Sequence, residues 1–304
     1  MKLITFRTAD EARFGAWHDG LCWDLAAAAE LSDEGPLFAP RSVKELLAGG
    51  AAALAQAREL LHLAAGAHDP LGCGLAYEPA AVELLPPVPD PQKIIAIGLN
   101  YRDHCREQNV PEPTVITMFC KFPSAALGAG APIVLPPPHV SAQVDYEAEL
   151  ALVIGRRGVN IAESEALSYV AGYTCCNDVS ARDVQYGDGG KQWVHGKSFD
   201  TFAPLGPWLV TSDELPDPHA LDIRCVLNGQ VMQASNTSNL VFRVERLVSE
   251  LSQALTLMPG DVITTGTPGG VGVWRQPQVF LQPGDRVTIA IEGIGELTNP
   301  VVAS

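Results

Sequence analysis

The chain has 304 residues, of which 47% are hydrophobic, and it carries a formal net charge of −15. This composition supports a large core in one or two domains, and an acidic chain without a basic run is not expected to bind nucleic acid or an anionic membrane. The chain has seven cysteines and no C-x-x-C pair, which argues against a disulfide framework. Its N-terminus lacks the apolar core of a signal peptide, and no apolar stretch reaches the ~20 residues that span a bilayer. These features favour a cytoplasmic protein without disulfides.

The first part of the chain predicts a small domain of mixed structure. Short strands are expected at residues 2–7 and 12–25, around turns of Gly and Asp. Ser42 with Glu45 three residues later is a capping-box pattern that begins a helix, and a second helix is expected at 51–63. Four prolines in residues 83–92 indicate an extended linker. We therefore predict an N-terminal α+β domain at 1–85 and a larger domain at 86–304.

The larger domain is expected to be rich in strands. Residues 94–100 form a buried-strand pattern, and a short helix follows with Asn100 as its N-cap. From residue 133 onward, short strands alternate with Gly and Pro, and two helices interrupt them near 164–170 and 244–255. Because no βαβ rhythm is present, we predict an α+β fold with a mixed or antiparallel sheet.

Three acidic residues begin an otherwise apolar strand, in the sequence VDYEAELALVIG. In a strand, Asp145, Glu147 and Glu149 share one side, where their like charges repel. A cation among them would remove that repulsion, and oxygen ligands suit Mg²⁺ or Mn²⁺. The alternative is an edge strand whose acids are solvated, and the spacing alone leaves both interpretations open.

Polar residues in three further segments suit an anionic ligand. Asp178, Arg182 and Gln185 follow one another at i, i+4 and i+7, which is one face if the segment is helical; an ordinary Asp–Arg pair is the alternative. Lys197 stands among glycine and apolar residues and needs an anionic partner. Thr267 precedes a Gly-rich loop whose N–H groups could hold a carboxylate. Taken alone, each of the last two segments is equally typical of a turn.

Six stretches, in this order, resemble the fumarylacetoacetate hydrolase superfamily. They are GLNYRDH, DYEAELALVIG, GYTCCNDVSARDVQ, GKSFDTFAPLGP, TSNLVF and PGDVITTGTPGGVG. They extend over roughly two thirds of the chain, from residue 94 to the C-terminus. The chain is most similar to the shorter branch that includes acylpyruvate hydrolases, oxaloacetate decarboxylases and oxaloacetate tautomerases.

The resemblance implies a fold, an ion and a substrate site. The fold is a β-rich, mixed-sheet roll with a smaller N-terminal domain, assembled as a homodimer. The ion is Mg²⁺, with Mn²⁺ as the alternative, and its ligands are Glu147, Glu149 and Asp178, while Asp145 supports them. The residues placed around a bound 2-oxo acid are Arg182, Gln185, Lys197 and Thr267, with Lys197 also offsetting negative charge during catalysis.

His104 and Glu107 are candidates for acid–base chemistry. They lie at i and i+3 of the short helix, so their side chains can meet, and Glu107 would orient the imidazole as a general base. The alternative is a surface histidine on a charged helix. With the resemblance, the pair favours hydrolysis of a C–C bond in an acylpyruvate through an enolate. Oxaloacetate decarboxylation or tautomerisation, isomerisation or hydration of unsaturated 2-oxo dioic acids, and a non-catalytic metal-binding protein stay open as alternatives.

Overall fold

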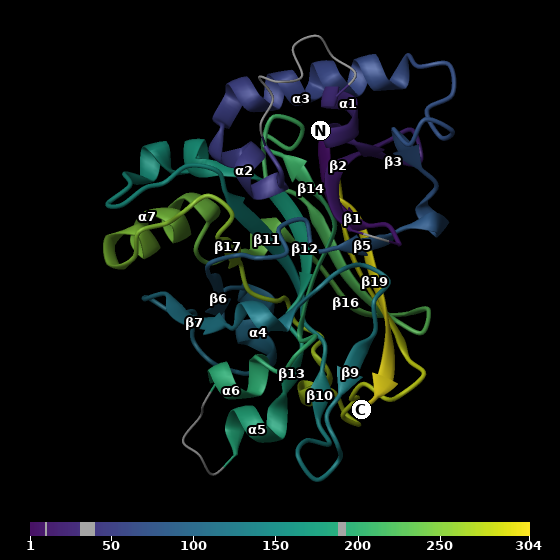
Figure 1. Cartoon of the computed structure of the whole chain (residues 1–304). Coiled ribbons are helices and arrows are strands. Elements are labelled where there is room, and N and C mark those ends of the chain that lie inside the picture. Colours follow the sequence, from purple (N-terminus) through teal and green to yellow (C-terminus); the bar gives the residue numbers. More distant parts are fainter. Residues whose placement is uncertain (10, 31–39, 188–192) are drawn as a thin grey trace.

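Strands from the first, middle and last thirds of the chain meet in one large mixed sheet. The computed structural model describes residues 1–304 except 10, 31–39 and 188–192 (Figure 1). Among the described residues, the main path of this 12-stranded sheet runs β4-β3-β2-β1-β14-β12-β11-β17-β6-β7. A second sheet has the order β16-β15-β18-β19-β9, and β10 pairs with β13.

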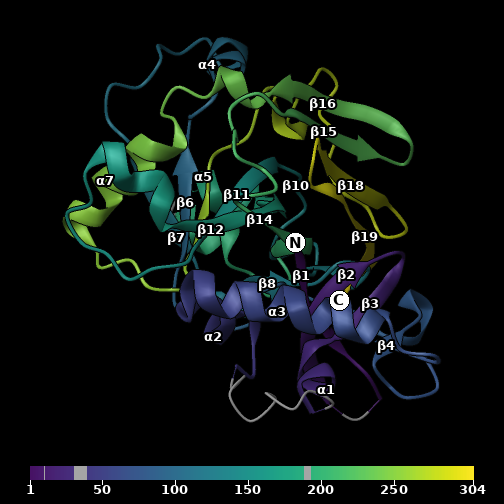
Figure 2. The ribbon, with the colours of Figure 1, turned by 90° about the horizontal axis from the view of Figure 1, so that it is seen from above.

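The N-terminal part supplies one edge of the large sheet and the helices above it. Its strands and helices are β1 (Lys2–Arg7), β2 (Ala12–His18), β3 (Leu21–Asp24), α1 (Leu25–Glu30), α2 (Val43–Ala48), α3 (Gly50–Ala65), β4 (Ala76–Tyr77), the 3₁₀ turn η2 (Pro79–Ala81) and β5 (Glu83–Leu85). Helix α3 lies across this end of the molecule, as the view from above shows (Figure 2).

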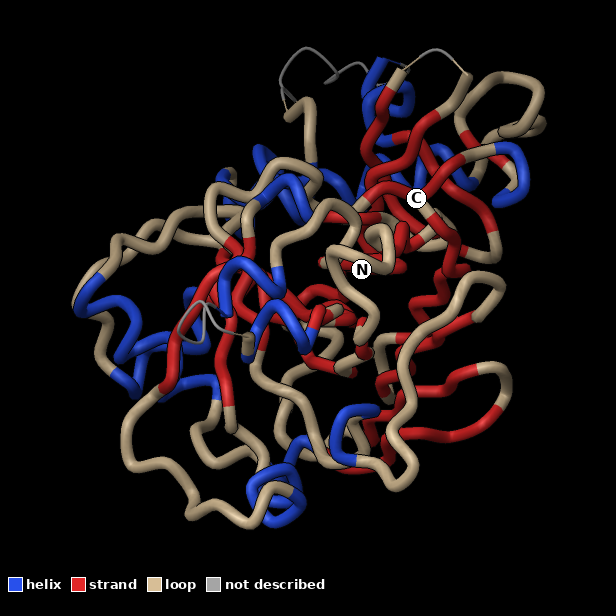
Figure 3. Tube along the Cα trace, turned by 90° about the horizontal axis from the view of Figure 1, so that it is seen from below, coloured by secondary structure: helices blue, strands red, loops and turns tan. Residues whose placement is uncertain are grey.

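The middle of the chain supplies the other edge and the central strands. Its elements are β6 (Ile94–Gly98), α4 (Arg102–Glu107), β7 (Thr117–Lys121), η3 (Pro123–Ala125), β8 (Ala126–Leu127), β9 (Ile133–Leu135), β10 (Val144–Asp145), β11 (Ala148–Ile154), η4 (Glu163–Tyr169), β12 (Val170–Asn177), β13 (Ser180–Ala181), α5 (Arg182–Tyr186) and α6 (Trp193–Lys197). Helices α5 and α6 lie at the end opposite α3 (Figures 1 and 3).

The last third completes both sheets. It contains β14 (Ala203–Thr211), β15 (Asp222–Leu227), β16 (Gln230–Asn236), η5 (Thr237–Asn239), α7 (Val244–Ala254), β17 (Val262–Thr264), η6 (Gly272–Trp274), β18 (Arg286–Ile291) and β19 (Gly295–Ala303). Strand β17 runs parallel to β6 and antiparallel to β11. The sheet is therefore mixed.

Strand β11 is buried on both faces because it lies in the middle of the sheet. Leu150, Leu152 and Ile154 belong to one hydrophobic cluster, and Ala151 and Val153 belong to the other. Alternating residues of a strand point to opposite faces, so each face of β11 enters a different core. The acids at its start are therefore attached to one of the most enclosed strands of the molecule and not to a solvated edge.

The N-terminal part shares a sheet and a core with the rest of the chain. Strand β1 pairs antiparallel with β14, with Lys2 opposite Val210. The proline-rich segment is packed as well as extended: residues 86–88 are buried, and the Thr5 hydroxyl donates to the Pro87 carbonyl over 2.8 Å. Division of the chain at residue 85 stays a prediction.

Several local expectations can be compared with the observed elements. Ser42 is the N-cap of α2 and accepts a hydrogen bond from the Glu45 N–H. The N-cap of α4 is Tyr101 and not Asn100, because the Asn100 amide bonds instead to the Phe242 and Thr265 carbonyls. The helix expected near 164–170 is a 3₁₀ helix. None of the described helices is long and apolar enough to cross a bilayer.

Candidate active site

Three buried carboxylates meet where β11 begins and β12 ends. Each of Glu147, Glu149 and Asp178 has an oxygen within 4.8 Å of the other two. The pairing of β11 with β12 sets Ala148 opposite Asn177, and the Asp178 N–H donates to the Glu147 carbonyl over 2.9 Å. Backbone pairing therefore places Glu147, which directly precedes β11, and Glu149 of β11 beside Asp178, which follows β12. Asp178 comes 29 positions after Glu149 in the sequence.

The expectation that Asp178, Arg182 and Gln185 share one face of a helix is wrong in part. Asp178 lies between β12 and β13, and only Arg182 and Gln185 are on helix α5. The Arg182 guanidinium still reaches the acids: it lies 2.7 Å from a Glu147 oxygen and 2.9 Å from an Asp145 oxygen. It also donates to the side-chain amide oxygen Oε1 of Gln185 over 3.1 Å. The short segment after β12 folds as a strand and then a helix, so the i+4 spacing does not apply.

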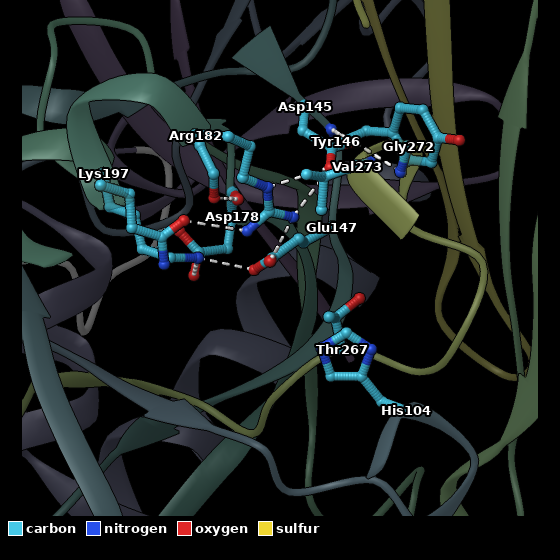
Figure 4. Close-up of polar contacts among 12 residues, drawn as sticks. His104, Asp145, Tyr146, Glu147, Asp178, Arg182, Lys197, Thr267, Gly272 and Val273 are labelled. Atoms are coloured by element: carbon cyan, nitrogen blue, oxygen red, sulfur yellow. Dashed lines mark hydrogen bonds and ion pairs between the residues drawn. The ribbon is translucent and has the colours of Figure 1, made fainter. Parts of the chain in front are cut away.

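Lys197 bridges two of the carboxylates. Its ammonium lies 2.7 Å from a Glu147 oxygen and 2.7 Å from an Asp178 oxygen (Figure 4). Burial opposes the charged form of Glu147, but Lys197 and Arg182 outweigh it and lower the pKa of that carboxyl. Burial likewise opposes the Lys197 ammonium, but Asp178 and Glu147 outweigh it and raise its pKa. Glu147 and Lys197 therefore stabilise each other's charged form, and their ion pair holds both side chains in place.

Lys121 is a further cation of this cluster, and the sequence analysis did not identify it. It projects from β7, is 1% exposed, and places its ammonium 2.5 Å from the second oxygen of Asp178. Burial lowers its pKa, and Asp178 offsets this only in part. A lysine at an inward-facing position of a short apolar strand was the available indication, since such a residue needs a buried anion.

Glu149 differs from its two neighbours. Among the described residues it forms no ion pair; its carboxylate accepts a hydrogen bond from the Gly266 N–H over 2.9 Å. Burial, followed by Asp178 and Glu147, raises the pKa of Glu149 well above its usual value. A buried carboxylate facing two others is stabilised by a cation, and three oxygen ligands in one place suit a hard divalent ion. These three residues therefore fit the divalent metal ion that the family resemblance implied.

Asp145 holds Arg182 and the loop that follows Thr267. Its carboxylate accepts hydrogen bonds from the backbone N–H groups of Tyr146, Gly272 and Val273, each between 2.8 and 2.9 Å (Figure 4). It also accepts from the Arg182 Nε over 3.0 Å. With all these donors it orients its neighbours and does not join the three-acid cluster, which agrees with the supporting role expected for it.

His104 and Glu107 form the expected pair. The imidazole Nδ1 lies 3.0 Å from a Glu107 oxygen, and the Gln108 amide nitrogen lies 2.7 Å from Nε2. The other Glu107 oxygen accepts from the Gly270 N–H over 2.8 Å. His104 is 6% exposed, so it is not the surface histidine of the alternative interpretation. With Glu107 accepting from Nδ1–H, Nε2 carries the lone pair that a base requires, and here that lone pair accepts a hydrogen bond from the Gln108 amide.

One cavity of about 280 Å³ connects the carboxylates with the imidazole. Eight of the nine site residues expected from the sequence line it, and Glu107 lies behind His104. The Thr267 hydroxyl donates to the Ala148 carbonyl over 3.0 Å and accepts from Gln233. The lining residues that the sequence analysis did not identify are Ile97, Gly98, Leu99, Gln108, Phe119, Tyr186, Trp193 and Trp274.

Comparison with known proteins identifies the family of this chain. Residues 93–302 match the family model described as fumarylacetoacetate (FAA) hydrolase C-terminal. The chain belongs to the fumarylacetoacetate hydrolase family. The α+β fold and the family predicted from the sequence are thus confirmed. As a member of this family, the chain is an enzyme.

Two relatives and one solved structure illustrate the similarity. Oxaloacetate tautomerase FAHD2A, mitochondrial, from Bos taurus is 55% identical over 221 residues, which are 73% of this chain and 70% of the relative. The protein of the same name from Homo sapiens is 48% identical over 263 residues, 86% of this chain and 80% of the relative. Maleylpyruvate hydrolase from Sphingobium sp. SYK-6, solved with manganese(II) and pyruvate, is 30% identical with a TM-score of 0.77, and the match covers both chains completely.

These names overturn one expectation. The cytoplasmic location favoured by the cysteine content and the N-terminus is contradicted, because both relatives are named mitochondrial. Free thiols do not separate the two compartments: all seven cysteines are unpaired here, and five of them are buried. Cysteine content indicates whether a protein forms disulfides. Thiols stay reduced in any reducing compartment, so this content does not distinguish the cytoplasm from a reducing organelle.

Proposed function

We propose that this protein catalyses keto–enol tautomerisation of oxaloacetate or of a closely similar 2-oxo acid, with a divalent cation held by Glu147, Glu149 and Asp178. The observation that carries the proposal is that the acidic cluster and the His104 imidazole line the same cavity. An ion at the cluster, Mg²⁺ or Mn²⁺, would polarise the 2-oxo group and acidify the adjacent C–H.

The residues of the chain then have distinct tasks. Once bound substrate replaces the Gln108 amide at Nε2, His104 takes the proton from C3 through that atom and returns it to the oxygen on C2, so the reaction leaves the net proton count unchanged. Glu107 keeps Nδ1 protonated and aims the ring, as its 3.0 Å contact supports. Gln185, Lys197 and Thr267 line the part of the cavity that would receive the 1-carboxylate. Arg182 holds Glu147 in place.

Tautomerisation is preferred over the hydrolysis that the sequence analysis ranked first. Relatives at 55% and 48% identity are named oxaloacetate tautomerases, whereas the maleylpyruvate hydrolase is 30% identical. Hydrolysis of an acylpyruvate stays the second candidate, because a His104–Glu107 pair that abstracts a proton from C3 can also abstract one from water.

A parallel assay tests this proposal. Decay of the enol absorbance of oxaloacetate is followed beside cleavage of acetylpyruvate and fumarylpyruvate, with Mg²⁺ present. We expect tautomerisation to exceed both cleavage rates, and His104→Ala to lower its kcat by about 10²- to 10⁴-fold. Oxalate binding should persist in that variant.

A histidine outside the cavity provides the control for this assay. His62→Ala, a change of an exposed histidine on α3, should leave the rate unchanged. Faster cleavage of either acylpyruvate than tautomerisation of oxaloacetate would establish the second candidate. Full activity after removal of divalent ions by a chelator would refute the role given to the acidic cluster.

A further inference from the structure

Part of the cavity wall is aromatic. Phe119, Tyr186, Trp193 and Trp274 line it, and they come from four separate elements: β7, α5, α6 and η6. The chemistry proposed above uses none of these side chains. They therefore raise the question of what this wall accepts and what it excludes.

Trp193 lies directly on Gly98, another residue of the cavity lining. A Cβ added at Gly98, the last residue of β6, would come within 2.4 Å of the indole Cζ3 and 3.0 Å of Cη2. The indole also meets the edge of Phe119, with the ring centroids 5.4 Å apart and an interplanar angle of 73°. The side chain thus closes one side of the cavity, and it can do so only because residue 98 has no side chain.

The position of Trp193 is linked to the ion-pair cluster. Trp193 and Lys197 are four residues apart on α6, so they lie on the same face of that helix. Phe119 contacts both, because the Lys197 ammonium lies 5.1 Å from the centre of its ring. Lys197 is fixed by Glu147 and Asp178, and the indole is consequently held at a set position relative to the acids.

The described part of this wall offers no unpaired cation to a long substrate. Among the described residues that line the cavity, the cations are Arg182 and Lys197, and both are already paired with buried carboxylates. A long apolar group in the cavity would meet aromatic side chains of its lining. Polar groups of a short substrate would instead meet His104 and Gln108.

We propose that Trp193, held over Gly98 and against Phe119, is a specificity-determining residue that restricts the site to short 2-oxo acids such as oxaloacetate and excludes those with longer chains. This inference rests on the proposed function only for the class of ligand. It concerns the length of the ligand and not the reaction performed on it.

The inference is tested by measuring the binding of two 2-oxo acids whose alkyl chains differ in length. Pyruvate and 2-oxohexanoate share the 2-oxo acid group and differ by three methylenes, and their dissociation constants are measured by calorimetry with the Mg²⁺-loaded enzyme. In Trp193→Ala we expect affinity for 2-oxohexanoate relative to pyruvate to rise by roughly 10-fold or more, because the added methylenes gain an apolar space. Trp193→Phe, which keeps a smaller ring, should give a lesser rise and also serves if the alanine variant does not fold.

The matched control is Trp274→Ala, which removes another indole from the cavity lining. Trp274 is 45% exposed, so its removal opens the mouth without extending an enclosed space, and the affinity ratio should change less than about 3-fold. An unchanged ratio in both Trp193 variants, or an equal rise in Trp274→Ala, would overturn the assignment. If the ratio rises as expected but oxaloacetate is not tautomerised by the wild type, the proposed function fails and the length limit stands.

Discussion

Individual carboxylates at the site differ in how their charge is neutralised. Asp178 is held between Lys121 and Lys197, and Glu147 between Lys197 and Arg182. Glu149 has no such partner among the described residues. Residues of one chemical type, within a few ångströms of one another, therefore respond differently to substitution.

Glu149→Gln should separate metal binding from folding. The amide keeps the shape of the carboxylate but removes a charge that faces Glu147 and Asp178, so stability in the presence of a chelator should be retained or increased. Affinity for Mn²⁺ should fall by roughly 10²-fold or more, since loss of even an outer partner of a ligand costs 10- to 100-fold. Titration calorimetry measures the affinity, and Glu59→Gln on the exposed side of α3 is the control. Unchanged Mn²⁺ affinity in the Glu149→Gln variant would show that Glu149 is no ligand.

Lys121→Met tests the buried pair with Asp178. The substitution leaves a buried carboxylate with one cation fewer, and breaking a buried ion pair from one side destabilises a protein by about 3–5 kcal/mol. Lys44→Met removes an exposed pair with Asp90 and should change the free energy of unfolding by less than about 1 kcal/mol. Urea denaturation of both variants, with a chelator present, compares the two. Similar small losses would mean that solvent reaches Asp178 when Lys121 is absent.

At the scale of elements, the short helix α4 is positioned by contacts outside itself. Asp103 accepts from the Ser235 hydroxyl over 2.5 Å, which attaches the helix to β16, and Glu107 accepts from the Gly270 N–H. A helix of six residues has little stability of its own, so these contacts determine where His104 lies. The position of the His104 imidazole therefore depends on residues that do not touch the cavity.

Asp103→Ala should reduce turnover without weakening ligand binding. Displacing a catalytic group by about 1 Å can lower a rate by roughly 10²-fold, and oxalate binding should remain within a few-fold of the wild type. Arg106→Ala, an exposed residue of the same helix, is the matched control. Separate measurement of kcat and oxalate affinity distinguishes the two outcomes. A parallel loss of both quantities would indicate general unfolding of the site instead.

At the scale of the whole molecule, residues 1–85 complete the sheet while the cavity is lined by later residues. Leu46 on α2 is fully buried in the cluster that also contains residues of β11 and β14. This part of the chain is therefore expected to contribute stability and not chemistry. We predict in addition that the enzyme is a homodimer, which sedimentation would measure directly.

Leu46→Ala should lower the free energy of unfolding by about 2–5 kcal/mol, the usual effect of truncating a buried leucine. Turnover per folded molecule should stay within a few-fold of the wild type. Active-site titration corrects the rate for the folded fraction. Loss of catalysis in a protein that is still folded and dimeric would show that the N-terminal part shapes the site.

The sequence alone determined the family, the strand-rich fold and the three acids, because ordered short motifs carry functional side chains at fixed chain positions. The tertiary structure decided how these groups are neutralised and enclosed. Lys121, Gln108 and Trp193 are ordinary residues in the sequence, and they become part of the site only because β7, α4 and α6 converge on it. Such contacts join residues distant along the chain, and neither residue spacing nor composition encodes the distance between their atoms.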